Sequence, residues 1–289
     1  MTELRYEAPV SLDAAVSLLS GASGGGKIFA GGTDVLVQLH ADMIEPDILV
    51  DIKNIPDVKN MVEVDGAWSV GAAVSGMTIV DNDDFKEAWP GVCEGVALIG
   101  SVQVKGRASI GGNLCNASPA ADSVPAIIAA GAIAKIIGPN GPREEAVENI
   151  ITGPGKTSLG EGELIVSFAF PPRPAHSGDC YLRLTPRTEM DIAVVGSGVN
   201  VVLDDQGKCV MARVSIGAVA PTPLLVSEAS EALIGSEVDG AALDKMVEAV
   251  RGACDPINDK RGTKEYRIKT AGVIARRAAL KALERAKAN

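Results

Sequence analysis

The stretch GASGGGKIFAGGTDVLVQL, residues 21–39, contains two glycine clusters separated by a short apolar segment. The first cluster, residues 21–27, nearly matches the phosphate-binding loop of ATPases. In such a loop a strand leads into the glycines and a helix leaves them, so that free main-chain N–H groups face the anion. The order of strand and helix around each cluster therefore decides which of them suits a phosphate.

The first cluster has the opposite order. SLDAAVSLLS, residues 11–20, predicts a helix that begins after Ser11 and ends at Gly21. The apolar residues that follow the cluster predict a strand. Ile28 also stands where the ATPase motif carries Ser or Thr for magnesium. We interpret residues 21–27, the glycine run, as a helix stop and a turn.

The second cluster, AGGTD at residues 30–34, is called the first turn below. It has a strand before it and a helical pattern, TDVLVQLHAD, after it, with Thr33 or Asp34 as the expected N-cap. Glycines there let a ligand approach the main chain. A tight strand–helix turn without any ligand explains the same residues.

A similar segment, SIGGN at residues 109–113, is called the second turn. Asn116, Ser118 and Asp122 follow it and could form hydrogen bonds. Two such turns from different parts of the chain would suit a ligand with two phosphates. No GxGxxG opens a helix after a strand, so a Rossmann dinucleotide site is not indicated.

Composition limits the possible functions. The chain has 289 residues, 46% hydrophobic and 22% charged, as in ordinary globular proteins. A formal charge of −10 and 3% aromatic residues argue against a nucleic-acid partner. Five cysteines without a CxxC pair and two histidines predict no metal or iron–sulfur site. We see no secretory signal and no apolar run long enough for a membrane span, so we expect a cytoplasmic protein.

The order of elements predicts three domains. Residues 1–55 read as α-β-loop-α-β, and residues 56–174 begin with a hairpin that turns at Asp65-Gly66. PPRPAHSG, residues 171–178, is the expected linker. The last domain, residues 178–289, is predicted to contain an antiparallel meander from Ile192 onward and two final helices.

Three ordered segments resemble the FAD-binding subunits of the molybdenum hydroxylases, the family of xanthine dehydrogenase and aerobic carbon monoxide dehydrogenase. These are AGGTD at 30–34, IGSVQVKGRASIGGNLCNASPAAD at 99–122 and DPINDKRGTKEYRIKTAGVIARRAAL at 255–280. The resemblance implies an α+β fold: an FAD-binding fold of the vanillyl-alcohol oxidase (PCMH) type with two subdomains, plus a C-terminal α/β domain like that of the CO dehydrogenase flavoprotein.

The resemblance also implies which residues bind FAD, without a covalent bond. Main-chain N–H groups of the first motif would hold the diphosphate, the second turn would hold the phosphates and ribityl chain from the other side, and Asp122 would accept from a sugar hydroxyl. The implied set is Ile28, Phe29, Ala30, Gly31, Gly32, Thr33, Asp34, Val35, Ile99, Ser109, Ile110, Gly111, Gly112, Asn113, Asp122, Ile165 and Arg183.

Some features have two readings. Arg183 stands where many relatives place a lysine near the flavin. Its positive charge would either stabilise a reduced, anionic flavin or form part of a surface ion pair. Arg187 and Asp191 read as a pair that braces a turn. The basic residues from Lys264 onward are a solvated helix face or a docking surface for an acidic subunit. Cys115 is expected to pack rather than to link to the flavin.

The implied function is electron transfer. The chain would be an oxidoreductase component without catalytic residues of its own, passing electrons from the [2Fe-2S] clusters of a small subunit through FAD to an external acceptor. A large subunit would hold the molybdenum cofactor, in a dimer of heterotrimers. The alternatives are a free-standing flavoprotein oxidase or reductase of the same fold, and a nucleotide-binding or assembly module that has lost electron transfer.

Overall fold

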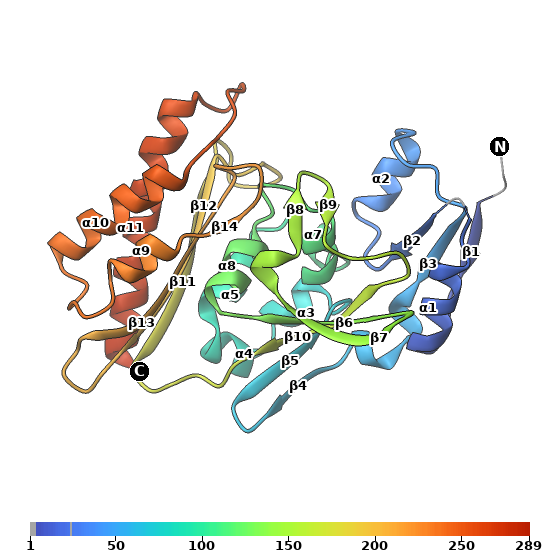
Figure 1. The fold of residues 1–289 in the computed structure, drawn as a ribbon, viewed down its shortest axis with the longest axis horizontal. Helices are drawn as coiled ribbons and strands as arrows, with labels where there is room; N and C mark the ends of the chain where they lie inside the picture. Colours follow the sequence, from blue (N-terminus) through green and yellow to red (C-terminus); the bar gives the residue numbers. More distant parts are fainter. Residues whose placement is uncertain (1–3, 24) are drawn as a thin grey trace.

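The computed structural model describes residues 4–23 and 25–289. Residues 1–3 of the first predicted domain, and Gly24 of the glycine run, lie outside the described residues. Figure 1 shows three groups of strands in a row, with the N-terminal residues at one end and the C-terminal helices at the other. Among the described residues, no helix combines the length and apolar character that crossing a bilayer would need.

The N-terminal unit is a three-stranded parallel sheet in the order β1-β3-β2. Helix α1 begins as predicted, because Ser11 Oγ accepts from the Ala14 N–H at 3.3 Å, and Gly21 ends it. The sequence does not predict β1, because its three residues are all exposed and show no apolar alternation. The elements are β1 (Arg5–Glu7), α1 (Leu12–Ser20), β2 (Gly26–Phe29), α2 (Val35–His40), β3 (Ile48–Asp51) and the 3-10 turns η1 (Ile52–Asn54) and η2 (Pro56–Val58).

The middle unit is a five-stranded antiparallel sheet in the order β4-β5-β10-β6-β7, together with the two-stranded sheet β8-β9. The predicted hairpin is confirmed: Asp65 and Gly66, both with positive φ, join β4 to β5. The elements are β4 (Met61–Val64), β5 (Ala67–Gly71), α3 (Gly76–Val80), α4 (Asp83–Ala88), α5 (Pro90–Ala97), α6 (Val102–Lys105), α7 (Ile110–Cys115), α8 (Ser123–Ala129), β6 (Ile133–Gly138), β7 (Gly141–Ala146), η3 (Val147–Asn149), β8 (Ile151–Gly153), β9 (Lys156–Thr157) and β10 (Leu164–Phe170).

The segment between α5 and α8 contains two short helices that the sequence does not predict. Its small residues and glycines have weak helix propensity, so the pattern indicates irregular chain. Each helix depends on a serine cap instead: Ser101 Oγ accepts from Val104 N–H, and Ser109 Oγ accepts from Gly112 N–H. The second turn therefore forms the start of α7 rather than an open loop.

The C-terminal unit is an antiparallel sheet in the order β11-β12-β13-β14. Helix α11 packs along β11 and β12, while α5 and α8 pack against the same strands from the other side (Figure 1). All nine residues of β12 are buried, as expected for a strand covered on both faces. The elements are β11 (Ser177–Leu184), β12 (Val195–Leu203), β13 (Cys209–Gly217), β14 (Leu224–Leu225), α9 (Ser227–Glu231), α10 (Gly240–Ala253) and α11 (Lys264–Ala288).

Strand β11 lies before the predicted start of the meander at Ile192, and its first two residues fall in the predicted linker. Its alternating residues meet different neighbours. A Cβ on Gly178 would lie 2.1 Å from the carbonyl oxygen of Ala282 in α11, whereas Asp179 Oδ2 accepts from the Gly91 N–H at the start of α5 at 2.9 Å. This strand therefore joins the C-terminal unit to the middle unit.

Neither reading of the basic C-terminal residues holds for all of them. Arg267 is buried, at 3% exposure, and donates to the carbonyl oxygen of Val194 at 2.8 Å. Lys281 and Arg285 bind Glu94 of α5, at 2.6 and 2.7 Å. Part of the basic face is thus used inside the chain, where it holds α11 against α5.

Candidate functional site

A cavity of about 810 Å³ lies where the N-terminal unit, the middle unit and the β11–β12 loop meet. The first turn, residues 30–34, lines it from one side. Ser109, Gly111, Gly112 and Asn113 of the second turn line it from the other. This volume is in the range of sites that enclose a whole small-molecule cofactor.

The first turn requires both of its glycines. A Cβ on Gly31 would lie 2.1 Å from the carbonyl oxygen of Arg107, and Gly32 has φ +75° with the Phe29 ring 2.6 Å from its Cβ position. Within the described residues, the main-chain N–H groups of Gly31, Gly32 and Thr33 have no acceptor. Unpaired N–H groups beside a cavity are the feature that an anion needs.

The second turn contributes differently. Its N–H groups are largely used already: Gly112 donates to Ser109 Oγ at 3.1 Å, and Gly111 donates to the carbonyl oxygen of Ala72 at 3.2 Å. The similarity expected between the two turns therefore does not extend to these two N–H groups, because the second turn is the capped start of a helix. Asn113 offers another donor, since its Oδ1 accepts from Ser123 and its Nδ2 has no partner within the described residues.

A side-chain bridge joins the two sides of the cavity. Asn116 Nδ2 donates to Asp34 Oδ1 at 3.3 Å, and Gln38 Nε2 donates to Asn116 Oδ1 at 3.1 Å. Asp34 occupies the N-cap position of α2 as expected, but its side chain makes no capping bond. Burial raises the pKa of Asp34. The carboxylate thus fixes the distance between the turns instead of capping the helix.

Asp122 lines the cavity and is already held by two donors. Its carboxylate accepts from the Tyr181 hydroxyl at 3.0 Å and from Arg183 Nη1 at 2.6 Å. Burial raises the pKa of Asp122 to about 6, although both partners oppose the rise. Arg183 has a side chain that is only 5% exposed and does not line the cavity, so the reading as a surface ion pair is wrong: the pair is buried.

The β11–β12 loop closes one end of the cavity with Met190, Asp191 and Ile192. Asp191 accepts from the main-chain N–H groups of Arg187 and Ile192, at 3.0 and 2.8 Å. The Nε atom of Arg187 lies 3.7 Å from Asp191 Oδ2, so the predicted pair that braces this turn is confirmed. Met190 has a positive φ of 52°.

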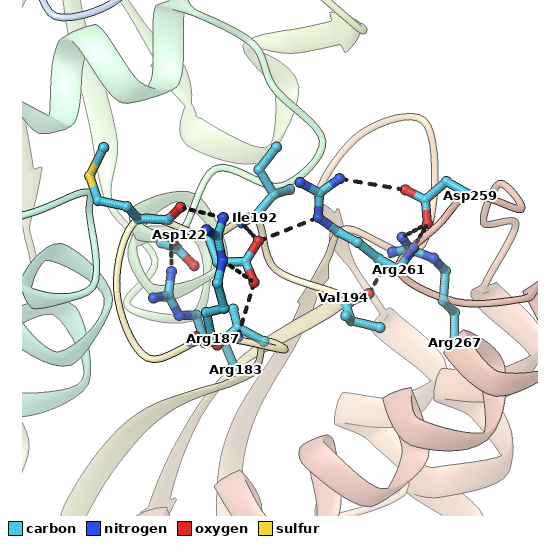
Figure 2. A network of polar contacts seen from close by, with 11 residues as sticks. Asp122, Arg183, Arg187, Ile192, Val194, Asp259, Arg261 and Arg267 are labelled. Atoms are coloured by element: carbon cyan, nitrogen blue, oxygen red, sulfur yellow. Dashed lines mark hydrogen bonds and ion pairs between the residues drawn. The ribbon is translucent and has the colours of Figure 1, made fainter.

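Figure 2 shows how this loop is fastened to the last helix. Arg261 Nε lies 3.5 Å from Asp191 Oδ1 and Arg261 Nη1 lies 4.0 Å from Asp259 Oδ2. Asp259 in turn accepts from Arg267 of α11 at 2.8 Å. The loop at the cavity is therefore part of a polar network that reaches the C-terminal unit.

Most of the residues implied to bind FAD meet at this cavity. Three do not line it: Phe29 lies against Gly32, Ile110 is buried in the core at 1% exposure, and Arg183 lies behind Asp122. Those that do line it are Ile28, Ala30, Gly31, Gly32, Thr33, Asp34, Val35, Ile99, Ser109, Gly111, Gly112, Asn113, Asp122 and Ile165.

Sequence reasoning missed several lining residues. Gly25, Gly26 and Lys27 of the glycine run line the cavity, so this run is more than a helix stop. Gly26 and Lys27 belong to β2, and no local pattern signals the parallel pairing of this strand with β3. Cys115 lines the cavity too, and burial raises the pKa of its thiol to about 12, which leaves it protonated and unreactive. The other lining residues outside the implied set include Gln38, Asn116, Glu161, Glu163 and residues 190–192.

Comparisons with known proteins identify the family of this chain. Residues 2–173 match the model of the FAD binding domain in molybdopterin dehydrogenase, and residues 181–282 match the CO dehydrogenase flavoprotein C-terminal domain. The chain is 31% identical to the putative xanthine dehydrogenase FAD-binding subunit of Escherichia coli (strain K12), over 91% of this chain and 90% of that protein. It is 32% identical to the carbon monoxide dehydrogenase medium chain of Afipia carboxidovorans, over 98% and 97%.

Solved structures show the same fold. A chain of the cyanide-inactivated Cu,Mo-CO dehydrogenase superposes with a TM-score of 0.93 at 31% identity, covering 99% of both chains. A chain of quinoline 2-oxidoreductase from Pseudomonas putida 86 superposes with a TM-score of 0.88 at 26% identity, covering 98% of both.

The fold and the cavity define a flavoprotein of mixed helix and strand. The chain belongs to the family of FAD-binding subunits of the molybdenum hydroxylases, which are oxidoreductases. The resemblance stated from the sequence is thereby confirmed, and so are its fold class and its cofactor.

Proposed function

We propose that this chain is the electron-transfer subunit of a multi-subunit molybdenum hydroxylase. In this role it receives electrons from [2Fe-2S] clusters on a small partner subunit and delivers them to an external acceptor. Bound FAD supplies the redox chemistry, because it can accept and release electrons. The chain's own residues bind the cofactor, exclude water from it and set its electrostatic surroundings.

The observation that carries this proposal is the row of unpaired N–H groups at Gly31, Gly32 and Thr33 beside a cofactor-sized cavity. These groups suit the diphosphate of FAD, with the main chain from Ile28 to Val35 around it. Gly112 presents no Cβ on the opposite side, and Asn113 supplies a free amide donor. The residues present therefore fit a dinucleotide with its phosphates between the two turns.

The remaining residues of the implied set have supporting roles in this proposal. Ile99 and Ile165 give apolar walls, and Asp122 orients a sugar hydroxyl through a lone pair that Tyr181 and Arg183 leave free. Arg183 acts through Asp122, because its guanidinium is bound to that carboxylate. Its positive charge offsets the negative charge of the Asp122 carboxylate beside the cavity.

The proposed partners follow from the names of relatives. One relative is the medium chain of a carbon monoxide dehydrogenase, and another is subunit alpha of the 6-hydroxypseudooxynicotine dehydrogenase complex of Paenarthrobacter nicotinovorans. We infer a large molybdopterin subunit and a small iron–sulfur subunit, assembled as a dimer of heterotrimers in the cytoplasm.

We also propose the domain division 1–55, 56–174 and 178–289.

The proposal is tested by expressing the chain alone and with its native partners. The isolated chain should bind FAD, as seen by absorbance and by quenching of flavin fluorescence. Its flavin should stay oxidised with small organic substrates and become reduced only in the assembled complex. A colourless chain that takes up no FAD would contradict cofactor binding, and reduction of the isolated chain by such a substrate would instead support a free-standing oxidase.

A further inference from the structure

A charged cluster lies behind the first turn, outside the cavity. Lys53, in η1, donates from Nζ to the carbonyl oxygen of Ala30 at 2.9 Å and to Asp51 Oδ1 at 2.7 Å. Its ammonium also lies 4.2 Å from the centre of the Phe29 ring. Lys53 is partly buried and does not line the cavity, so it would touch the main chain of the turn and not the cofactor.

The bond to Ala30 fixes the direction of the next N–H group. The described chain has no cis peptide bond, and in a trans peptide the C=O and the N–H point in opposite directions. Because Lys53 holds the Ala30 carbonyl oxygen on its own side, the N–H of Gly31 must point away from Lys53. Gly31 lines the cavity and its N–H has no partner within the described residues.

Phe29 and Asp51 hold the Lys53 side chain in place beside the first turn. The Phe29 ring contacts the Lys53 ammonium and also lies against Gly32, whose Cβ position is 2.6 Å from the ring. Asp51 holds Lys53 from the other side and accepts a hydrogen bond from the Tyr6 hydroxyl. Burial alone would raise the pKa of Asp51, but its bonds to Lys53 and Tyr6 outweigh that effect and lower it. Asp51 therefore stays ionised and keeps Lys53 in place.

Basic side chains are scarce in the lining of the cavity, so a diphosphate there depends on main-chain donors. Lys27 is the one basic residue among the lining residues that the structure describes. A diphosphate would add further negative charge to a wall that already holds five carboxyl groups. These belong to Asp34, Asp122, Glu161, Glu163 and Asp191. Arginines outside the lining pair with three of them, namely Asp122, Glu163 and Asp191.

We propose that Lys53 is a positioning residue for the diphosphate site: through its bond to the Ala30 carbonyl oxygen it orients the Gly31 N–H toward the cavity. This inference rests on the proposed seat of the FAD diphosphate. It assigns a role to a residue whose side chain touches neither the cofactor nor any lining side chain of the opposite turn. The ligand class that it serves is a nucleoside diphosphate.

The test compares Lys53→Met with Lys59→Met, which removes the same charge from an exposed site nearby. Titration of the full apo-chain with FAD, ADP and adenosine separates the diphosphate from the rest of the ligand. We expect Lys53→Met to weaken FAD and ADP binding about tenfold or more, the size of one charged hydrogen bond, and to leave adenosine binding unchanged. Lys59→Met should match the wild type.

Phosphorus NMR of bound FAD gives a second readout. The diphosphate resonances should shift in Lys53→Met and not in Lys59→Met. Lys53→Arg keeps the charge and the donor, so it should restore most of the affinity, whereas Lys53→Gln should restore only part of it. If Lys53→Met does not fold, the FAD and ADP affinities of Lys53→Arg and Lys53→Gln test the same role of Lys53.

Wild-type affinity of Lys53→Met for FAD and ADP would overturn this inference, and so would an equal loss for ADP and adenosine, which indicates general damage. Both outcomes leave the proposed function intact. Failure of the wild-type chain to bind FAD would instead overturn the proposed function.

Discussion

At the scale of residues, the site depends on glycines at positions where any side chain would collide with neighbouring main-chain atoms. Gly31 lies against the Arg107 carbonyl oxygen and Gly111 against that of Ala72, where a Cβ would lie 2.1 and 2.5 Å from these atoms. Both contacts join main-chain segments far apart in the sequence. The glycines are therefore needed for packing as well as for access of the cofactor to the main chain.

Replacement of Gly31 by alanine should separate these segments. The added methyl group would meet the Arg107 carbonyl oxygen, so we expect a loss of about 1–3 kcal/mol in the free energy of unfolding. We also expect FAD affinity to fall by about tenfold or more, because the N–H groups of the first turn move. Urea denaturation and FAD titration measure the two effects.

Gly252→Ala is the matched control, because nothing lies within 4 Å of its Cβ position. That variant should bind FAD as the wild type does. If Gly31→Ala did the same, the first turn would not hold the diphosphate.

The polar residues show what the sequence could and could not predict. The order of strand, glycines and helix around AGGTD predicts accessible main chain, and residues 30–34 do line the cavity, although the same order also fits a tight turn without a ligand. It could not show that Asp34 binds Asn116, or that Asp122 already carries Tyr181 and Arg183 as partners. Such partners come from distant strands and helices, and their identity depends on tertiary packing.

At the scale of elements, helix α11 is held to the middle unit by charge. Glu94 of α5 accepts from Lys281 and Arg285 of α11 and from the main-chain N–H of Tyr181 in β11. Burial opposes ionisation of Glu94, but these partners outweigh it and lower its pKa. One carboxylate thus joins three elements at the boundary between the middle unit and the C-terminal unit.

Replacement of Glu94 by glutamine should weaken that boundary. Lys281 and Arg285 would lose the negative charge of their partner, and the amide group keeps only one of the two acceptor oxygens, so we expect a loss of about 1–3 kcal/mol in the free energy of unfolding at neutral pH. Since the pKa of Glu94 is lower in the folded chain, its contribution is full above the unfolded value and disappears as pH falls through the folded value. The difference between wild type and variant should therefore shrink below about pH 4.

Denaturation at several pH values checks this expectation. Glu87→Gln, at an exposed position of α4, is the control and should change stability little at any pH. A Glu94→Gln effect that stayed constant as the pH fell would rule out an ionic origin.

The elements that the sequence predicts are those with a clear local pattern. Helix α1, the β4–β5 hairpin and the helices α10 and α11 have caps, turn residues or apolar periodicity. Strands β1 and β11 lack such signals, because they are stabilised by partners distant in sequence. Helices α6 and α7 do have serine caps, but the glycines and small residues of their segment hide the helical pattern. Local sequence patterns therefore predict some of the helices and strands, whereas the others depend on tertiary contacts that the sequence does not show.

At the scale of the whole molecule, the cavity is shared by all three groups of strands. The N-terminal unit gives the first turn, the middle unit gives the second turn, and the β11–β12 loop closes one end. That loop is tied to α11 through Arg261 and Asp259 (Figure 2). Cofactor binding should consequently depend on the C-terminal unit as well as on the FAD-binding fold.

The most direct test of the account is a crystal structure of the FAD-loaded chain. We expect the diphosphate oxygens to lie within hydrogen-bond distance of the main-chain N–H groups of Gly31, Gly32 and Thr33, with residues 109–113 facing them across the cavity. A diphosphate bound away from both turns, with those N–H groups left unpaired, would contradict the central claim.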